Sequence, residues 1–242
     1  MVQKLIQHKA DITLGYWGIR GLAQPIRFLL IASDISFSEV RFGVLQDGTI
    51  LDESMEDDDW NRVKFKLEMP FPNLPYLIDS SEANAISISQ SNTILRYLAR
   101  RFDFYGDSDI DRIEIDMLQD EAYDFRNKII ETAYTLGHGY AFAFKQFSSD
   151  ILPYYLDRFE SYLINLKNRD FFVGDRLSLV DFVLYELFWQ MTLMVPGSIQ
   201  DANRPALSSF IRSFEKTPKI ANYIKSKNYI EHPINSPWAS FT

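Results

Sequence analysis

The sequence predicts a small α/β domain followed by an all-helical domain. Strand and helix signals alternate in the first part of the chain, whereas only helical periodicity follows residue 109. Between the two parts, residues 102–109 contain Gly106 and three aspartates, a composition typical of a linker. We therefore expect domains at residues 1–101 and 110–242, joined by a linker at 102–109.

The first elements form a βαβ pattern. Residues 12–17 are rich in strand-favouring types, and residues 18–21 contain two glycines and predict a turn. Pro25 suits the first turn of a helix, whose apolar stripe consists of Ile26, Leu29 and Leu30. Residues 37–42 predict the second strand.

A hairpin and a helix complete the expected α/β domain. Residues 46–59 are strongly acidic and predict an exposed loop. Residues 71–78 predict a loop that runs into a strand, with Pro75 in a constrained turn that suits a cis bond. Residues 79–84 predict a hairpin turn and residues 85–88 its returning strand, and the next helix begins within residues 89–92.

The second domain is expected to be entirely helical. The apolar spacing predicts long helices near residues 109–136 and 152–166, and shorter ones near 205–215 and 218–227. Ser178 and Asp181 have the spacing of a capping box, with Asp in the place of the usual Glu. The helix that they open is apolar nearly all round, so we expect it to be buried.

Composition excludes several classes of function. The chain has no cysteine, which excludes disulfides, thiolate metal sites and a cysteine nucleophile. The three histidines, His8, His138 and His232, lack ligand spacing, so no metal site is predicted. A net charge of −8 argues against nucleic acid as a partner. Without a signal peptide or a long apolar run, we expect a cytoplasmic protein with no membrane association.

Four motifs resemble the mu-class glutathione transferases. They lie in family-like order at residues 15–27, 71–79, 90–97 and 180–182, and the resemblance covers almost the whole chain. Ala23-Gln24-Pro25 and the C-terminal tail are similar to arachnid, particularly mite, members, some of which are allergens. The resemblance implies a thioredoxin-like N-terminal domain, a helical C-terminal domain and a homodimer.

The resemblance also implies the chemistry. Glutathione would be the co-substrate, with no permanently bound cofactor, and its thiolate would be conjugated to hydrophobic electrophiles in detoxification. Tyr16 matches the family tyrosine that donates a hydrogen bond to the glutathione sulfur. A bond of this kind lowers a thiol pKa by about one to two units. A chain without cysteine can therefore perform thiol chemistry, because the substrate supplies the sulfur.

Further residues match glutathione-binding positions of the family. Gln90 and Ser91 match the carboxylate-binding start of a helix, although both also suit an ordinary N-cap. Leu74 and Pro75 match a backbone clamp, in which a cis-proline leaves the preceding N–H and C=O to pair with the cysteinyl unit. The remaining matches are Trp17, Trp60, Lys64, Asn73 and, from the partner subunit, Asp124.

The resemblance assigns the electrophile pocket and the dimer interface as well. Tyr134 matches a tyrosine that donates to the electrophile in some mu-class members, with a helix-surface residue as the alternative. Tyr123 is a candidate wall of the electrophile pocket. Ile19, Leu22 and Val44 are further wall candidates. Phe71 matches an aromatic key that enters the partner subunit, with a buried loop aromatic as the alternative. Arg96 and Arg100 are expected near the dimer axis, with a solvated face as the alternative.

One position departs from the family pattern. The family places an arginine three residues before the tryptophan that matches Trp60, and this chain has Asp57 there. A carboxylate would repel the glycyl carboxylate of glutathione, so we expect weaker glutathione affinity unless Arg62 or another cation substitutes. Segments 43–59 and 79–88 also look longer than usual. These departures favour one alternative, a weakly catalytic ligand carrier. A glutathione-dependent isomerase that uses the same site is the second alternative.

Overall fold

The computed structural model describes residues 10–43, 53–166 and 169–242, and the side chains of its second helix from Asp59 onward. Two compact units are present. The first ends at Leu98 and also takes in Ile230–Pro233, whereas the second comprises Ala99–Tyr229 and Ile234–Thr242. The C-terminal part of the chain therefore contributes to both units.

The first unit contains a four-stranded mixed sheet in the order β2-β1-β3-β4. Its strands are β1 (Ile12–Trp17), β2 (Phe37–Phe42), β3 (Tyr76–Asp79) and β4 (Ile86–Ser89). β1 and β2 are parallel, whereas β1–β3 and β3–β4 are antiparallel. The predicted βαβ unit and hairpin are thus confirmed, with the return strand one residue later than expected.

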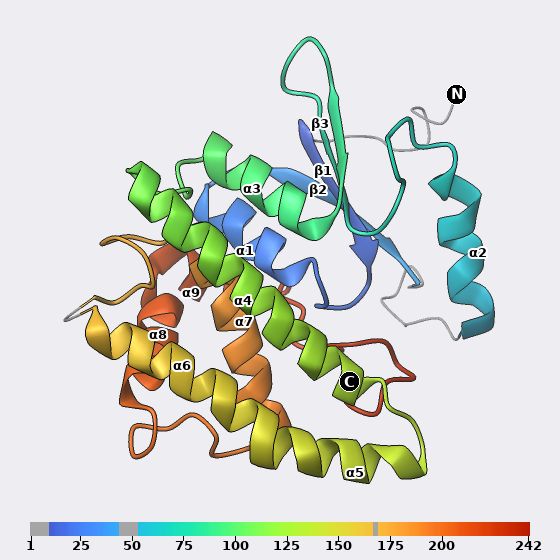
Figure 1. Ribbon diagram of the computed structural model, residues 1–242. Helices are drawn as coiled ribbons and strands as arrows, with labels where there is room; N and C mark the ends of the chain where they lie inside the picture. Colours follow the sequence, from blue (N-terminus) through green and yellow to red (C-terminus); the bar gives the residue numbers. More distant parts are fainter. Residues whose placement is uncertain (1–9, 44–52, 167–168) are drawn as a thin grey trace. The chain divides into compact units, whose positions relative to one another are not determined.

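The sheet is covered by helices on both sides. α1 (Gln24–Ala32) and α3 (Ser91–Arg101) lie on one side of it and α2 (Glu53–Lys64) lies on the other (Figure 1). Arg27 of α1 is buried and forms an ion pair of 2.6 Å with Glu39 of β2. It also donates to the carbonyl of Ile19 at 2.9 Å and to the side-chain oxygen of Gln24 at 3.2 Å. These additional hydrogen bonds offset the cost of burying the charge, so the pair fixes α1 on the sheet.

The expectation of a loop throughout residues 46–59 is wrong for residues 53–59, which belong to α2. Acidic residues occupy the first part of this helix and Arg62 and Lys64 its last turn, an arrangement that the helix dipole favours. Trp60 is only 5% exposed and anchors the helix to the unit. Residues 44–52 lie outside the described part of the chain.

A short C-terminal segment is bound into the first unit. The guanidinium of Arg20 is fully buried and donates to the carbonyl of Ile230 at 2.6 Å. The backbone N–H of Arg20 donates to the carbonyl of Pro233 at 3.0 Å. The turn after β1 is therefore held in place by residues far away in the sequence.

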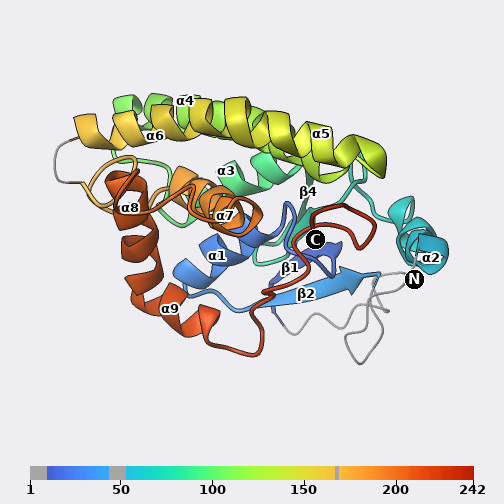
Figure 2. The ribbon, with the colours of Figure 1, turned by 90° about the horizontal axis from the view of Figure 1, so that it is seen from below.

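The second unit is helical, as expected. Its described helices are α4 (Asp109–Ala133), α5 (His138–Gln146), α6 (Leu152–Asn165), α7 (Leu179–Met194), α8 (Pro205–Lys216) and α9 (Pro218–Ile224). A π-helical turn at Phe147–Ile151 joins α5 to α6. Figure 2 shows the resulting rod running beside α4. α5 and the π-helical turn were not predicted, and α4 ends three residues earlier than predicted.

Aromatic side chains fill the core of the second unit around α7. The rings of Phe159, Phe172 and Phe188 lie within 6.2 Å of one another, centroid to centroid. The predicted capping box at Ser178 is confirmed, and α7 is buried on most of its surface. Within the described residues, none of the helices combines the length and hydropathy needed to cross a bilayer.

Candidate functional site

Most of the predicted glutathione-binding residues of the first unit meet at one end of the sheet. Gly15 pairs with Tyr76, and Tyr76 pairs with Ser89 on its other side. The residues just beyond this row come from three segments: Tyr16 and Trp17, Leu74 and Pro75, and Gln90 and Ser91. Strand register therefore brings together segments that lie far apart in the sequence.

Tyr16 lies at the end of β1 and is almost buried, with 5% of its surface exposed. Its phenolic oxygen accepts a hydrogen bond of 3.0 Å from the backbone N–H of Leu22. The turn after β1 thus wraps around the phenol. A phenol oxygen that accepts from this amide directs its own proton away from it.

An aromatic cluster supports this end of the sheet. Tyr76 stacks on Trp60 at 6.2 Å, and Phe42 packs edge-on against Trp60 at 5.3 Å. Burial raises the pKa of Tyr76 to about 12, so this phenol stays protonated at physiological pH. Trp17 packs edge-on against Phe42 at 6.3 Å. Trp60 is therefore a core residue here, and its contact with glutathione stays a prediction.

The loop before β3 carries the residues of the predicted clamp. The Leu74–Pro75 bond is cis, as the sequence suggested. The N–H of Leu74 donates to the side-chain oxygen of Asn73 at 2.9 Å. A peptide that pairs with this N–H must therefore displace the exposed Asn73 side chain. Ser89 donates to the carbonyl of Phe71 at 2.9 Å and holds the loop against the end of β4.

The start of α3 carries the two residues predicted to bind a carboxylate. Gln90 precedes the helix with a φ of 72°, and its carbonyl accepts from Ile94 N–H at 3.0 Å. Gln90 is exposed and Ser91 is 8% exposed. The backbone N–H groups at a helix start attract carboxylates, because they carry the positive end of the helix dipole.

Lys64 was expected near the glycyl end of glutathione, with Arg62 as a candidate substitute for the missing arginine. The ammonium of Lys64, in the last turn of α2, lies 5.4 Å from the centre of the Phe65 ring. Arg62 is exposed on the same helix. The side chain of Asp57, like Val44, lies outside the described residues.

The remaining predicted site residues are divided between the units. Ile19 is buried and Leu22 is half-buried in the turn that wraps Tyr16. In the second unit, Tyr123 and Asp124 are exposed on α4. Tyr134 ends this helix, and its oxygen accepts from Ser236 N–H at 3.1 Å.

Phe71, the predicted aromatic key, is strongly exposed. It is 82% exposed with a φ of 51°, which excludes its burial within its own unit. Arg96 is half-buried. Arg100 is exposed, and its guanidinium lies 5.2 Å from the centre of the Tyr105 ring.

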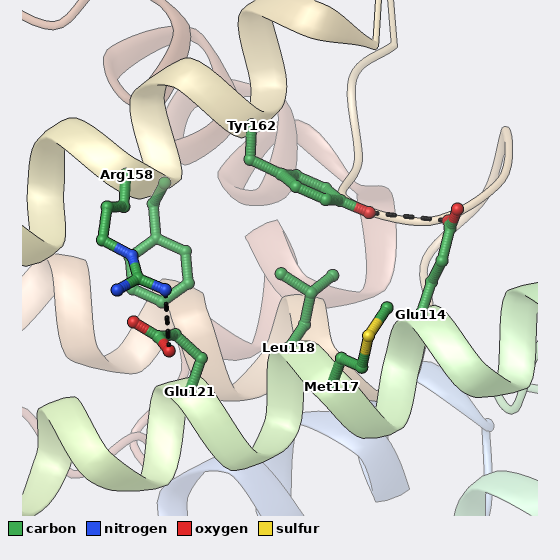
Figure 3. A pocket seen from close by; sticks show the side chains of 7 residues that line it. Glu114, Met117, Leu118, Glu121, Arg158 and Tyr162 are labelled. Carbon is green, nitrogen blue, oxygen red and sulfur yellow. Dashed lines mark hydrogen bonds and ion pairs between the residues drawn. The ribbon is translucent and has the colours of Figure 1, made fainter.

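A pocket of about 340 Å³ opens between α4 and α6, and sequence reasoning missed it. Figure 3 shows its apolar base at Met117 and Leu118, flanked by two polar contacts. Arg158 pairs with Glu121 at 3.2 Å, and Tyr162 donates to Glu114 at 3.5 Å. Burial, and then the charge of Glu114, raise the pKa of Tyr162 to about 12. The only sequence signal was the helical spacing of Ile110, Ile113 and Met117, which are all exposed.

No cluster of three or more potential metal ligands occurs among the residues that the structure describes. His138 begins α5 and His232 lies in the segment bound to the first unit. His8 lies outside the described residues.

Comparisons with known proteins identify both units. The model of the glutathione S-transferase N-terminal domain matches residues 12–100, and that of the C-terminal domain matches residues 123–227. Human glutathione S-transferase Mu 3 is 35% identical over 233 residues, with 96% of each chain covered. Glutathione S-transferase Mu 1 of Mus musculus is 37% identical over 229 residues, covering 95% of this chain and 97% of that one. The chain belongs to the glutathione S-transferase family.

This transferase also matches solved structures of the family. The crystal structure of the glutathione S-transferase Blo t 8 aligns with a TM-score of 0.80 at 27% identity, covering 95% of this chain and 99% of that one. The predicted mu-class resemblance, the thioredoxin-like domain with its helical partner and the transferase activity are confirmed. The family uses glutathione as its co-substrate. The sheet end built around Tyr16 falls within the N-terminal family match.

Proposed function

We propose that this transferase holds the glutathione sulfur as a thiolate with the hydroxyl of Tyr16 and conjugates it to hydrophobic electrophiles in cytoplasmic detoxification. The observation that carries this proposal is the position of the hydroxyl. It accepts from Leu22 N–H at 3.0 Å, at the end of the sheet where the Leu74–Pro75 segment and the start of α3 meet. A phenol in this arrangement has its proton directed toward another acceptor.

A hydrogen bond from the Tyr16 hydroxyl to the sulfur is strong enough to lower the thiol pKa. A bond to a charged acceptor contributes about 1.5–3 kcal/mol, and one pKa unit corresponds to about 1.36 kcal/mol. A thiol of pKa ~8.5 is therefore lowered by about one to two units. At pH 7 the thiolate fraction rises from a few per cent to roughly a quarter or more. Because the thiolate is the nucleophile, the rate rises with this fraction.

The surrounding residues would orient the tripeptide. Its γ-glutamyl carboxylate would meet the N–H groups at Gln90 and Ser91, and its cysteinyl backbone would pair with Leu74. Trp60, Trp17, Lys64 and Asn73 would hold the remainder, together with Asp124 of the partner subunit. The thiolate then attacks the electrophilic carbon, a C–S bond forms, and the leaving group departs with its bonding electrons.

A homodimer is part of this proposal. Phe71 exposes an aromatic ring on the first unit, and α4 exposes Ile110, Ile113 and Met117 on the second. Exposed apolar faces of this kind are typical of an interface. The pocket between α4 and α6 has an apolar base that suits a phenyl ring, so we assign it to Phe71 of a second copy. Arg96 and Arg100 would lie near the axis.

A conjugation assay tests the proposed chemistry. With glutathione and a chlorodinitrobenzene, Tyr16→Phe should lower kcat/KM roughly tenfold to a hundredfold, because one charged hydrogen bond is lost. Tyr140→Phe, on α5, is the matched control and should keep native activity. A native protein as slow as Tyr16→Phe would instead support the carrier alternative. Calorimetry with glutathione alone separates a binding defect from a chemical one.

The two alternatives have less support than conjugation. The relatives that cover nearly the whole chain are named glutathione S-transferases, which does not favour a carrier or an isomerase. Tyr123 and Tyr134, with Ile19 and Leu22, are the proposed walls of the electrophile pocket. Replacing Tyr123 by Ala should then change the preference among electrophiles more than the affinity for glutathione.

A further inference from the structure

The turn after β1 contains a glycine at a position where the Tyr16 phenol leaves no room for a side chain. Gly21 has a φ of 41°, in the region that favours glycine. A Cβ at this position would lie 2.5 Å from the Tyr16 hydroxyl oxygen and 2.8 Å from its Cε1. These distances are shorter than any normal contact, so an alanine here requires a shift of one of the two groups.

Hydrogen bonds restrain the backbone of this turn. Its start is held by Gly18 N–H, which donates to the carbonyl of Phe42 at 2.9 Å. Its middle is held by Arg20, whose N–H donates to Pro233 and whose carbonyl accepts from Ala23 and Gln24 at 3.1 and 3.0 Å. The added methyl group would therefore displace the hydroxyl rather than the backbone.

We propose that Gly21 is a positioning residue for the Tyr16 hydroxyl. Its missing side chain lets the turn close on the phenol until Leu22 N–H reaches the oxygen at 3.0 Å. That hydrogen bond fixes where the phenolic proton points, and so fixes where a sulfur atom must lie to receive it. This inference rests on the proposed thiolate-holding role of Tyr16.

The test measures the pKa of enzyme-bound glutathione from the ultraviolet absorbance of its thiolate, in a double-mutant cycle. Gly21→Ala should raise this pKa by about one unit and lower kcat/KM about tenfold, because a displaced hydroxyl loses most of its contact with the sulfur. Gly174→Ala is the matched control. Gly174 has a φ of 69° with open space around it, so alanine there carries the backbone penalty without a contact.

The cycle distinguishes the possible outcomes. In a Tyr16→Phe background, Gly21→Ala should change the thiol pKa no further. A Gly21→Ala enzyme with the native thiol pKa, or one whose effect persists in full without the hydroxyl, would overturn the inference. If Tyr16→Phe alone leaves the thiol pKa unchanged, the proposed function fails, and this inference fails with it.

Thermal unfolding covers the case in which Gly21→Ala does not fold. Tyr16→Ala removes both the 2.5 Å contact with the oxygen and the 2.8 Å contact with Cε1, so Gly21→Ala should lower the unfolding temperature less in a Tyr16→Ala background than in the native chain. An equal loss of stability in both backgrounds would overturn the inference.

Discussion

The phenolic oxygen of Tyr134 accepts a hydrogen bond of 3.1 Å from the backbone N–H of Ser236, across 102 residues of chain. Ser240 forms two hydrogen bonds nearby, both of 2.8 Å. Its N–H donates to the carbonyl of Ala133, and its hydroxyl donates to the carbonyl of Thr135. The C-terminal tail is therefore fastened to the end of α4. Of these three bonds, only the bond to Tyr134 depends on a side chain at this end of α4; the other two use backbone carbonyls.

Replacing Tyr134 by Phe should loosen this tail. One hydrogen bond contributes about 1 kcal/mol, so amide exchange at Ser236 should become roughly fivefold faster. Hydrogen exchange measured by mass spectrometry on the C-terminal peptide provides the check. Tyr123→Phe, exposed on the same helix, is the control and should leave the tail as protected as before. Equal exchange in both variants would show that Ser240 alone holds the tail.

The capping box of α7 should have a characteristic pH dependence. Asp181 is fully buried and accepts from Phe172 N–H at 2.9 Å and from Ser178 N–H at 2.7 Å. Burial raises its pKa to about 6, against 3.8 for a free carboxyl group. Below about pH 6 the folded protein therefore binds a proton that the unfolded chain does not. The contribution of Asp181 to stability then rises as pH falls.

Asp181→Asn should cost about 1–3 kcal/mol, because one buried donor loses its acceptor. The difference in unfolding free energy between the native chain and this variant should widen by about 1 kcal/mol from pH 7 to pH 5. Urea unfolding at both pH values measures it. A difference that narrows would mean that the hydrogen bonds outweigh burial and depress the pKa of Asp181.

Asp57→Arg should tighten glutathione binding. The substitution would replace repulsion of the glycyl carboxylate by attraction, an effect of about 1 kcal/mol at a surface and so roughly fivefold in Kd. Isothermal calorimetry with glutathione is the measurement. Asp59→Arg, an exposed position on the same helix, makes the same change of charge. If both variants tighten binding equally, net charge and not position 57 is responsible.

Phe71→Ala should weaken the proposed homodimer. Loss of an aromatic anchor typically costs 2 kcal/mol or more, so the dimer Kd should rise more than tenfold in sedimentation experiments. Phe142→Ala is the matched control, since Phe142 is 74% exposed on α5. Because Asp124 is expected to act across the interface, glutathione affinity should fall with dissociation in Phe71→Ala and stay native in Phe142→Ala. A native monomer at micromolar concentration would contradict this proposal.

Local patterns were sufficient for the elements with a clear propensity, periodicity or capping signal. β1, β2 and α1 were predicted from strand-favouring residues and an apolar stripe, and Ser178 with Asp181 predicted the start of α7. α5 was missed because Tyr140, Phe142 and Phe144 alternate with alanines, a period typical of a strand. No residue of α5 is buried, so α5 has no buried apolar stripe to predict it. Its alanines favour helix, and the π-helical turn joins it to α6.

The same distinction applies to the candidate site, where residues within motifs were predicted and contacts between distant segments were not. Tyr16, Pro75 and Gln90 were found from their motifs, and their meeting at one end of the sheet follows from the predicted βαβ unit and hairpin. Tyr134 and Ser236 lie 102 residues apart in irregular segments, so no sequence pattern predicts their contact. The pocket between α4 and α6 depends on how two helices cross, which apolar spacing does not specify.

The bond between Arg20 and Ile230 limits how this enzyme can be dissected. A chimaera that exchanges only residues 10–98 with a relative would give the buried guanidinium a foreign carbonyl at the far end of the chain. Disturbing a buried charge in this way costs several kcal/mol. Domain swaps and truncations should therefore transfer Ile230–Pro233 together with the N-terminal half.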